Sequence, residues 1–184
     1  ILTCLASKLS NRQVIWVEDR LEHLTAASSA TGRLTKLRAS INERGLIEAL
    51  DYDQIDDVGA YPRAPEPASL YRMHGNLSGA YKVKNISCRN RVVLTNKTPS
   101  GLNRGFGGPQ HYFALERLVH QIAVELNLNV LDVIKVNLLE KKQFPYKSPS
   151  GALLDSGNFQ KLVKKVVKSS TYKNILKKKN NAIK

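Results

Sequence analysis

The sequence predicts an α+β fold, namely a mixed β-sheet with a long hairpin in its N-terminal half, packed with three helices from its C-terminal half. Strand-like alternation comes first along the chain, a stretch rich in glycine and proline follows, and helical spacing of apolar residues dominates the rest. The chain has 184 residues, 42% of them hydrophobic and 24% charged. That composition is typical of a globular protein that buries a core of its own.

The hairpin is the clearest element of the predicted sheet. Its strands are expected at Arg33 to Ile41 and at Leu46 to Ala60. Leu37 and its neighbours two and four positions later alternate with polar residues, as in a strand with one buried face. The turn Asn42-Glu43-Arg44-Gly45 ends on a glycine, which suits a position with positive φ.

Shorter elements are predicted on both sides of the hairpin. Leu2 to Leu9 is interpreted as the end of a helix, and Gln13 to Val17 as a short β-branched strand. Two more strands are expected at Tyr81 to Ile86 and at Arg91 to Asn96. Three prolines between Tyr61 and Ser69 predict an extended or loop conformation there.

Three helices are predicted in the C-terminal half. The first runs from about Pro109 to Asn127 and the second from about Leu131 to Leu139. The third begins near Asn158, with Asp155 or Ser156 as its cap. The apolar residues that place the first helix recur at helical spacing: Leu115, Leu118, Val119, Ile122 and Leu126.

The net charge of +14 is concentrated at the end of the chain. Residues 161–184 contain nine lysines and no acidic residue, which leaves +5 for residues 1–160. A lysine-rich end can bind RNA, DNA or an anionic membrane, or it can be a solvated helix face. Only Tyr172 could stack on a base, so we expect no nucleic-acid binding. We therefore divide the chain into a unit of residues 1–160 and a lysine-rich helical end and tail, 161–184.

Other features limit the class of protein. No apolar run approaches the roughly 20 residues that span a bilayer. The first residues lack the basic start and the cleavage site of a secretory signal, so a cytoplasmic protein is expected. Cys4 and Cys88 lie far apart and no histidines cluster with them, which argues against a zinc or iron–sulfur site in this chain. We expect both cysteines to be small buried or half-buried residues.

A glycine-rich loop before the first of these helices is the strongest candidate for a ligand site. It consists of Arg104, Gly105, Phe106, Gly107, Gly108, Pro109 and Gln110. Glycines let a backbone approach a ligand, and a helix N-terminus attracts anions. Arg104 offers a planar cation for a carboxylate, a phosphate or an oxo group, and Phe106 offers a ring. The loop fits neither a P-loop nor a dinucleotide-binding motif, and taken alone it could be a plain tight connection.

Several blocks together resemble the large subunits of molybdenum hydroxylases. That family includes the aldehyde oxidoreductases, the xanthine dehydrogenases and the aerobic carbon monoxide dehydrogenases. The similarity extends from about Leu5 to about Val167. The blocks, in chain order with the glycine-rich loop among them, are residues 14–24, 57–61, 79–86, 95–99, 114–118 and 144–151.

The resemblance implies a molybdenum–pyranopterin cofactor, either molybdopterin or its cytosine dinucleotide, shared with other segments of the large subunit. It implies hydroxylation or oxidation of an aldehyde, an N-heterocycle or carbon monoxide. Iron–sulfur clusters and FAD would lie only on partners, a small and a medium subunit. The remaining large-subunit segments would be partners too.

The resemblance also assigns site residues. Arg104, Gly105, Phe106, Gly107, Gly108 and Gln110 would line the cofactor. Phe106 would also flank the substrate, and Arg72 falls where xanthine dehydrogenases carry a substrate-orienting arginine, although a surface role fits Arg72 equally well. Within the loop, Phe106, Gly108 and Gln110 favour the xanthine or aldehyde type over the carbon monoxide type.

The resemblance is incomplete at both ends. The family's first glycine-rich cofactor loop and its late glutamate base have no counterpart in this sequence. We therefore assign no catalytic residue and no metal ligand, and expect turnover only in an assembly with the missing segments. The alternative is a catalytically inactive basic binding module, or a structural module, derived from the family.

Overall fold

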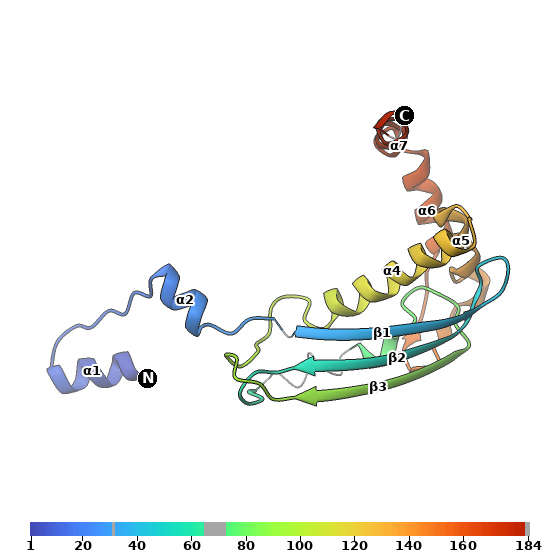
Figure 1. The fold of residues 1–184 in the computed structure, drawn as a ribbon. Coiled ribbons are helices and arrows are strands. Elements are labelled where there is room, and N and C mark those ends of the chain that lie inside the picture. The colour runs from blue at the N-terminus through green and yellow to red at the C-terminus, as the bar shows by residue number, and fades with distance from the viewer. Residues whose placement is uncertain (31, 65–72, 183–184) are drawn as a thin grey trace.

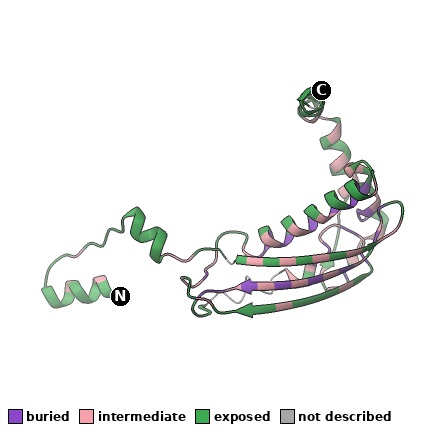
Figure 2. Ribbon diagram, viewed as in Figure 1, coloured by how far each residue is buried: buried purple, intermediate pink, exposed green. Residues whose placement is uncertain are grey.

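The computed structural model describes residues 1–30, 32–64 and 73–182. A three-stranded sheet forms the centre of the molecule, and one long helix, α4, lies along one face of it (Figure 1). The residues of the sheet that face α4 are the most buried ones, whereas the opposite face is largely exposed or half-buried (Figure 2). We call the face under α4 the inner face.

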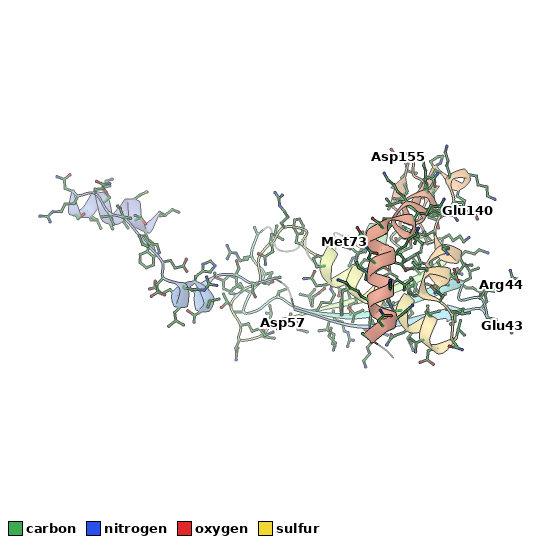
Figure 3. The ribbon with its side chains drawn as sticks, turned by 90° about the horizontal axis from the view of Figure 1, so that it is seen from above. Glu43, Arg44, Asp57, Met73, Glu140 and Asp155 are labelled. Atoms are coloured by element: carbon green, nitrogen blue, oxygen red, sulfur yellow. The ribbon has the colours of Figure 1, made fainter. Side chains whose placement is uncertain are left out.

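The hairpin consists of strands β1 (Gly32–Ile41) and β2 (Ile47–Asp57), which pair in antiparallel fashion. Gly45 has a φ of 73° in the connecting turn, and Asn42 accepts the backbone N–H groups of Arg44 and Leu46. Figure 3 shows Glu43 and Arg44 at this turn, at the opposite end of the hairpin from Asp57. The predicted hairpin and its turn are confirmed.

The third strand differs from the prediction. A single strand, β3 (Asn85–Val93), pairs in parallel with β2, where the sequence predicted two strands at 81–86 and 91–96. Tyr81 forms only an isolated bridge to Leu138, and residues 94–96 leave the sheet. Short β-branched runs predict extended backbone but not its pairing partner, so the continuous strand was missed. The strand order β1-β2-β3, with one antiparallel and one parallel pair, confirms a mixed sheet.

Helices α4 (Gly108–Glu125) and α5 (Val130–Asn137) cover the inner face and close the core. Leu115, Val119 and Ile122 are the buried face of α4, which confirms the predicted helical stripe. These three residues form one hydrophobic core cluster with Leu50 and Tyr52 of β2. Burial of such side chains contributes about 1.5–3 kcal/mol each, so this layer is the main source of stability.

The C-terminal part contains short elements and two further helices. They are η2 (Lys141–Gln143), β4 (Tyr146–Lys147), β5 (Leu153–Leu154), α6 (Phe159–Lys168) and α7 (Ser170–Ala182). A further short helix, η1 (His74–Asn76), lies between β2 and β3 in the chain. The cap of α6 is Asn158, which accepts the N–H of Lys161, and not Asp155 or Ser156 as predicted. The lysine-rich end, as far as the structure describes it, is contained in the two helices α6 and α7.

Residues 1–30 form an arm that extends away from the sheet (Figure 1). It contains α1 (Leu2–Ser10) and α2 (Arg20–Ala26), and the helix predicted at its start is confirmed. Asp19 and Glu22 form a reciprocal capping box that starts α2. The strand predicted at Gln13 to Val17 is wrong for this structure, because that segment pairs with no other strand among the described residues.

Both cysteines are exposed, against the expectation that they would be buried or half-buried. Cys4 lies on α1 in the arm, and Cys88 lies on the edge strand β3. Only Ile86 and Asn90 of β3 are half-buried and its other residues are exposed, so Cys88 shares the exposure of this edge strand.

Candidate cofactor-binding site

The predicted loop leads directly into the N-terminus of α4. Gly105 and Gly107 have φ values of 84° and 78°, a region that side chains other than glycine rarely adopt. Two tight turns shape it: the N–H of Phe106 donates to Asn103 at 3.0 Å, and that of Gly108 to Gly105 at 2.9 Å. Gly107 is the N-cap of α4, and a proline stands in its first turn. The prediction of a glycine loop running into a helix is confirmed.

The side chains of the loop differ in exposure. Arg104 and Gly105 are exposed, Phe106 and Gln110 are half-buried, and Gly107 and Gly108 are buried. Arg104 forms no ion pair with the part of the chain that the structure describes. A permanently charged guanidinium beside a helix N-terminus is therefore available to an anionic ligand.

The stretch before the loop is fastened to the end of β2. Ser100 donates its N–H to Val58 at 3.0 Å, and Ala60 donates to Lys97 at 3.0 Å. Asp57 accepts hydrogen bonds from Thr95, from the backbone of Gly59 and from Lys97, and these bonds lower the pKa of its carboxyl to about 2, the Lys97 ammonium contributing most. The position of the loop is thus set by the hairpin.

Gly59 is the tightest point of this fastening. Its φ is 77°, and a Cβ added there would lie 2.5 Å from the carbonyl oxygen of Thr98. We expect Gly59→Ala to lower the free energy of unfolding by about 2 kcal/mol or more, because it combines a strained φ with a clash against backbone. Urea denaturation would measure this. Gly75→Ala is the matched control, since no atom lies within 4 Å of its added Cβ, and an equal loss in both variants would contradict the prediction.

Below the first turns of α4, the inner face of the sheet is polar. Asp56 of β2 accepts two hydrogen bonds from Arg33 of β1, at 2.7 and 3.0 Å, and one from Asn90 of β3 at 2.8 Å. The side chains of Arg33 and Asp56 are only 3% and 0% exposed. The Asp56 carboxylate therefore links all three strands, through an ion pair to β1 and a hydrogen bond from β3, at the end of the sheet where the loop lies. We call these three residues, with Gln54 and His111, the polar bed.

His111 connects the polar bed to the helix. It lies in the first turns of α4, is fully buried, and its ring centroid is 5.5 Å from that of Tyr52. Burial lowers the pKa of its imidazole to about 4, and the positive charge of Arg33 acts in the same direction. The carbonyl of Leu77 opposes this shift, but it already accepts a hydrogen bond from the Tyr52 hydroxyl. His111 is thus held neutral.

Sequence reasoning missed the polar bed. The alternation of β1 already indicated part of it, because Arg33 lies four residues before Leu37 and therefore on the same face, which was assigned to the core. Gln54 is fully buried, and its amide has no hydrogen-bond partner among the described residues. Of the predicted site residues, Arg72 lies outside the described residues, so its role remains a prediction.

A groove of about 710 Å³ runs between β1 and α4 beside the loop. Pro109 and Gln110 line it at the loop end, together with Arg33 from the polar bed. Phe113 and Arg117 border it further along the helix. The groove shows that the start of α4 has an open side toward the free edge of the sheet.

Within residues 1–30, 32–64 and 73–182, no three His, Cys, Asp or Glu side chains are placed to hold a metal ion. In the same part of the chain, no helix has both the length and the apolar character required to cross a bilayer. The lysines of α6 and α7 are exposed.

Comparison with known proteins assigns the family. The model of the molybdopterin cofactor-binding domain matches residues 1–138, which include the arm, the sheet, the loop and α4. The chain belongs to this family. The family resemblance stated from the sequence is therefore confirmed.

Relatives of this molybdopterin cofactor-binding domain are large subunits of oxidoreductases. The chain is 29% identical to the carbon monoxide dehydrogenase large chain of Hydrogenophaga pseudoflava, over 94% of this chain and 22% of that one. It is 30% identical to subunit gamma of the 6-hydroxypseudooxynicotine dehydrogenase complex of Paenarthrobacter nicotinovorans, over 79% and 18%. The chain spans about a fifth of the length of these curated relatives.

Solved structures share the fold. Quinoline 2-oxidoreductase from Pseudomonas putida 86 superposes with a TM-score of 0.87 at 27% identity, covering 98% of this chain and 23% of that one. Carbon monoxide dehydrogenase from Oligotropha carboxidovorans gives 0.83 at 27% identity, over 99% and 23%.

The residues present fit one side of a molybdenum pterin. The cofactor carries phosphate and oxo groups, and the loop offers an exposed arginine and positive-φ glycines at the start of an 18-residue helix. Residues 101–115 contain no carboxylate, so the loop and the first two turns of α4 supply no acidic general base.

Proposed function

We propose that this chain is a segment of a molybdenum hydroxylase large subunit that binds one side of a molybdenum–pyranopterin cofactor through residues 104–110. The observation that carries the proposal is the loop itself. It combines an exposed Arg104, which forms no ion pair with the described residues, with two positive-φ glycines at a helix N-terminus, in a chain of the molybdopterin cofactor-binding family. Molybdopterin and its cytosine dinucleotide share the phosphate that Arg104 would bind.

The activity proposed for the assembled enzyme is hydroxylation of an aromatic N-heterocycle. The alternatives within the family are oxidation of an aldehyde or of carbon monoxide. Relatives named for nicotine, nicotinate and quinoline support the heterocycle. So does Phe106, a half-buried ring beside Arg104 that could flank a flat substrate. Carbon monoxide dehydrogenases are equally similar in overall sequence. The proposal of a heterocyclic substrate therefore depends on the loop residues and not on the overall sequence identity.

The residues of this chain would bind and position rather than transfer protons. When bound, the molybdenum centre supplies an oxygen to the substrate and accepts its electrons. Arg104 and the N–H groups of the loop would hold anionic groups of the cofactor, and the loop contains no acidic base. Turnover therefore requires the remaining large-subunit segments. An iron–sulfur small subunit and an FAD medium subunit are the proposed electron-accepting partners.

We expect Arg104→Ala to reduce pterin and molybdenum in the purified assembly by about tenfold, because a charge-assisted contact to an anion contributes about 1.5–3 kcal/mol. Metal analysis and the fluorescence of the oxidised pterin measure this without any activity assay. Arg44→Ala is the matched control, an exposed arginine at the hairpin turn, at the far end of the sheet (Figure 3). Unchanged pterin content in a folded Arg104→Ala assembly would contradict the proposal.

A further inference from the structure

Two fully buried side chains of the polar bed carry hydrogen-bonding atoms that the described residues do not satisfy. Gln54 of β2 and His111 of α4 are both 0% exposed. Neither the amide of Gln54 nor the ring nitrogens of His111 form a hydrogen bond with the described residues. The Leu77 carbonyl near the His111 ring accepts the Tyr52 hydroxyl instead, at 2.8 Å. Buried polar atoms in folded proteins nearly always have a partner, so a bound group is expected beside these two side chains.

Further unmatched polar atoms lie in the same region, between the sheet and the first turns of α4. Tyr52, whose ring centroid is 5.5 Å from that of His111, lies two residues before Gln54 on the same face of β2. Asn90 of β3 lies beside Gln54 in the parallel ladder, and its side-chain oxygen is buried without a partner among the described residues. The same holds for Nε2 of His74 in η1, a residue close enough for its charge to lower the pKa of His111. Four elements thus bring unmatched polar atoms to one part of the interior.

The chemistry of these atoms selects a neutral ligand that both donates and accepts hydrogen bonds. The Gln54 amide offers two N–H donors and a carbonyl acceptor, and a neutral imidazole offers one donor and one acceptor. An anion or a metal ion would match one half of this set and oppose the other half. The nearby charges of Arg33 and Asp56 already form a buried ion pair, and the described residues hold no group of three metal-ligating side chains. Water meets these requirements.

The groove beside α4 provides a route for water to the polar bed. Thr35 lies directly opposite Gln54 in the hairpin register, and it lines this groove of about 710 Å³. Gln110, the residue before His111, lines the groove from the helix side. Arg33 belongs to both the groove wall and the polar bed. Solvent in the groove is therefore one residue away from each of the two buried side chains.

We propose that the polar bed binds ordered water between Gln54 and His111 as part of the folded structure. Six unmatched atoms surround the site, two each on Gln54 and His111 and one each on His74 and Asn90. A buried water makes about three hydrogen bonds, so these atoms correspond to roughly two water molecules. The start of α4 then rests on the sheet through hydrogen-bonded water rather than through a dry contact. This chain forms the site without the cofactor, so Arg104→Ala should lose pterin and keep the water.

A crystal structure of the wild-type chain that shows ordered solvent tests the site directly. The expected result is a water within about 2.7–3.2 Å of both the Gln54 amide and a His111 ring nitrogen. A direct hydrogen bond between these two side chains, an ion in this place, protein groups on all six atoms, or no ordered density would overturn the proposal.

Oxygen-17 relaxation dispersion counts long-lived buried waters in solution. Gln54→Met keeps an unbranched side chain of the same length but removes both polar atoms. It should lower the dispersion amplitude of the full chain by the contribution of about one water. Gln121→Met, at an exposed glutamine of α4, is the matched control and should leave the amplitude unchanged. An unchanged amplitude in a folded Gln54→Met chain would refute the site.

If Gln54→Met does not fold, the His111 ring of the wild type decides the question. Nuclear Overhauser transfer from long-lived water to its ring protons is expected, because the water would be bound to its nitrogens. His120 is exposed on the same helix and should show only the weak transfer of fast-exchanging surface water. No more transfer to His111 than to His120 would rule out bound water at this place.

Discussion

Replacing Asp56 by alanine is expected to lower the free energy of unfolding by about 3–5 kcal/mol. Its fully buried carboxylate accepts two hydrogen bonds from Arg33 and one from Asn90. Without it, the guanidinium of Arg33 stays charged and buried with its main counter-charge removed. Chemical denaturation followed by circular dichroism measures the loss, and the midpoint should fall without a change in slope.

The outer face of the same strand provides the control for Asp56→Ala. Asp53 accepts a hydrogen bond from Arg91 at 2.7 Å, but that pair is partly exposed to water. Asp53→Ala should therefore cost no more than about 1 kcal/mol. The double variant Arg33→Met/Asp56→Leu should recover much of the loss, because removing both charges leaves none buried alone. Equal losses at Asp53 and Asp56 would show that the polar bed is not a buried ion pair.

The polar bed also bears on the site, because it lies under the part of α4 that the loop enters. Arg33 belongs to both the ion pair and the groove that Pro109 and Gln110 line. Hydrophobic packing holds the other end of α4, through Val119 and Ile122. The loop therefore enters α4 at the end that lies over the polar bed. A small displacement there changes hydrogen bonds rather than apolar contacts.

The hairpin and α4 were predictable because their signals are local. Alternation in β1 and β2, a glycine at the turn and apolar residues at helical spacing need no knowledge of partners. The loop was predictable for the same reason, since Gly105 and Gly107 occupy conformations that favour glycine. The bounds of the hairpin strands and of α4 could be predicted from the sequence to within a few residues.

Features that depend on pairing were not predictable. Gln13–Val17 has strand composition, but a strand forms only beside another strand, and no partner is present among the described residues. The polar bed depends on the register that sets Arg33 opposite Asp56 and Gln54 beside Asn90. Sequence periodicity assigns a face to each residue but not its cross-strand neighbour. Periodicity therefore places Arg33 on the buried face, but it does not identify Asp56 as the carboxylate that pairs with it.

Acidification should destabilise the chain between about pH 6.5 and pH 4, because of His111. Burial lowers the pKa of its imidazole to about 4 in the folded protein, whereas the unfolded chain should titrate near the ordinary 6.5. Below pH 6.5 the unfolded state thus binds more protons than the folded state. The stability that neutral His111 contributes is complete above pH 6.5 and falls as the pH drops toward 4, by about 3 kcal/mol in total.

The charges around His111 explain why protonation is unfavourable there. Arg33 of β1 and His74 of η1 both oppose a positive charge on its ring, while Tyr52 covers the ring without a negative charge. Burial and Arg33 lower the pKa of His74 as well, and Asp56 only partly offsets this. His74 should therefore add to the same acid limb.

Denaturation of wild type and of His111→Phe at pH 7, 6, 5 and 4 tests this assignment. The variant keeps a ring against Tyr52 but cannot bind a proton, so most of the stability loss between pH 6.5 and 4 should disappear. His120→Phe, an exposed position on the same helix, should keep the wild-type acid limb. If His111→Phe loses as much stability as wild type on acidification, carboxylates rather than this imidazole control the acid sensitivity of the helix start.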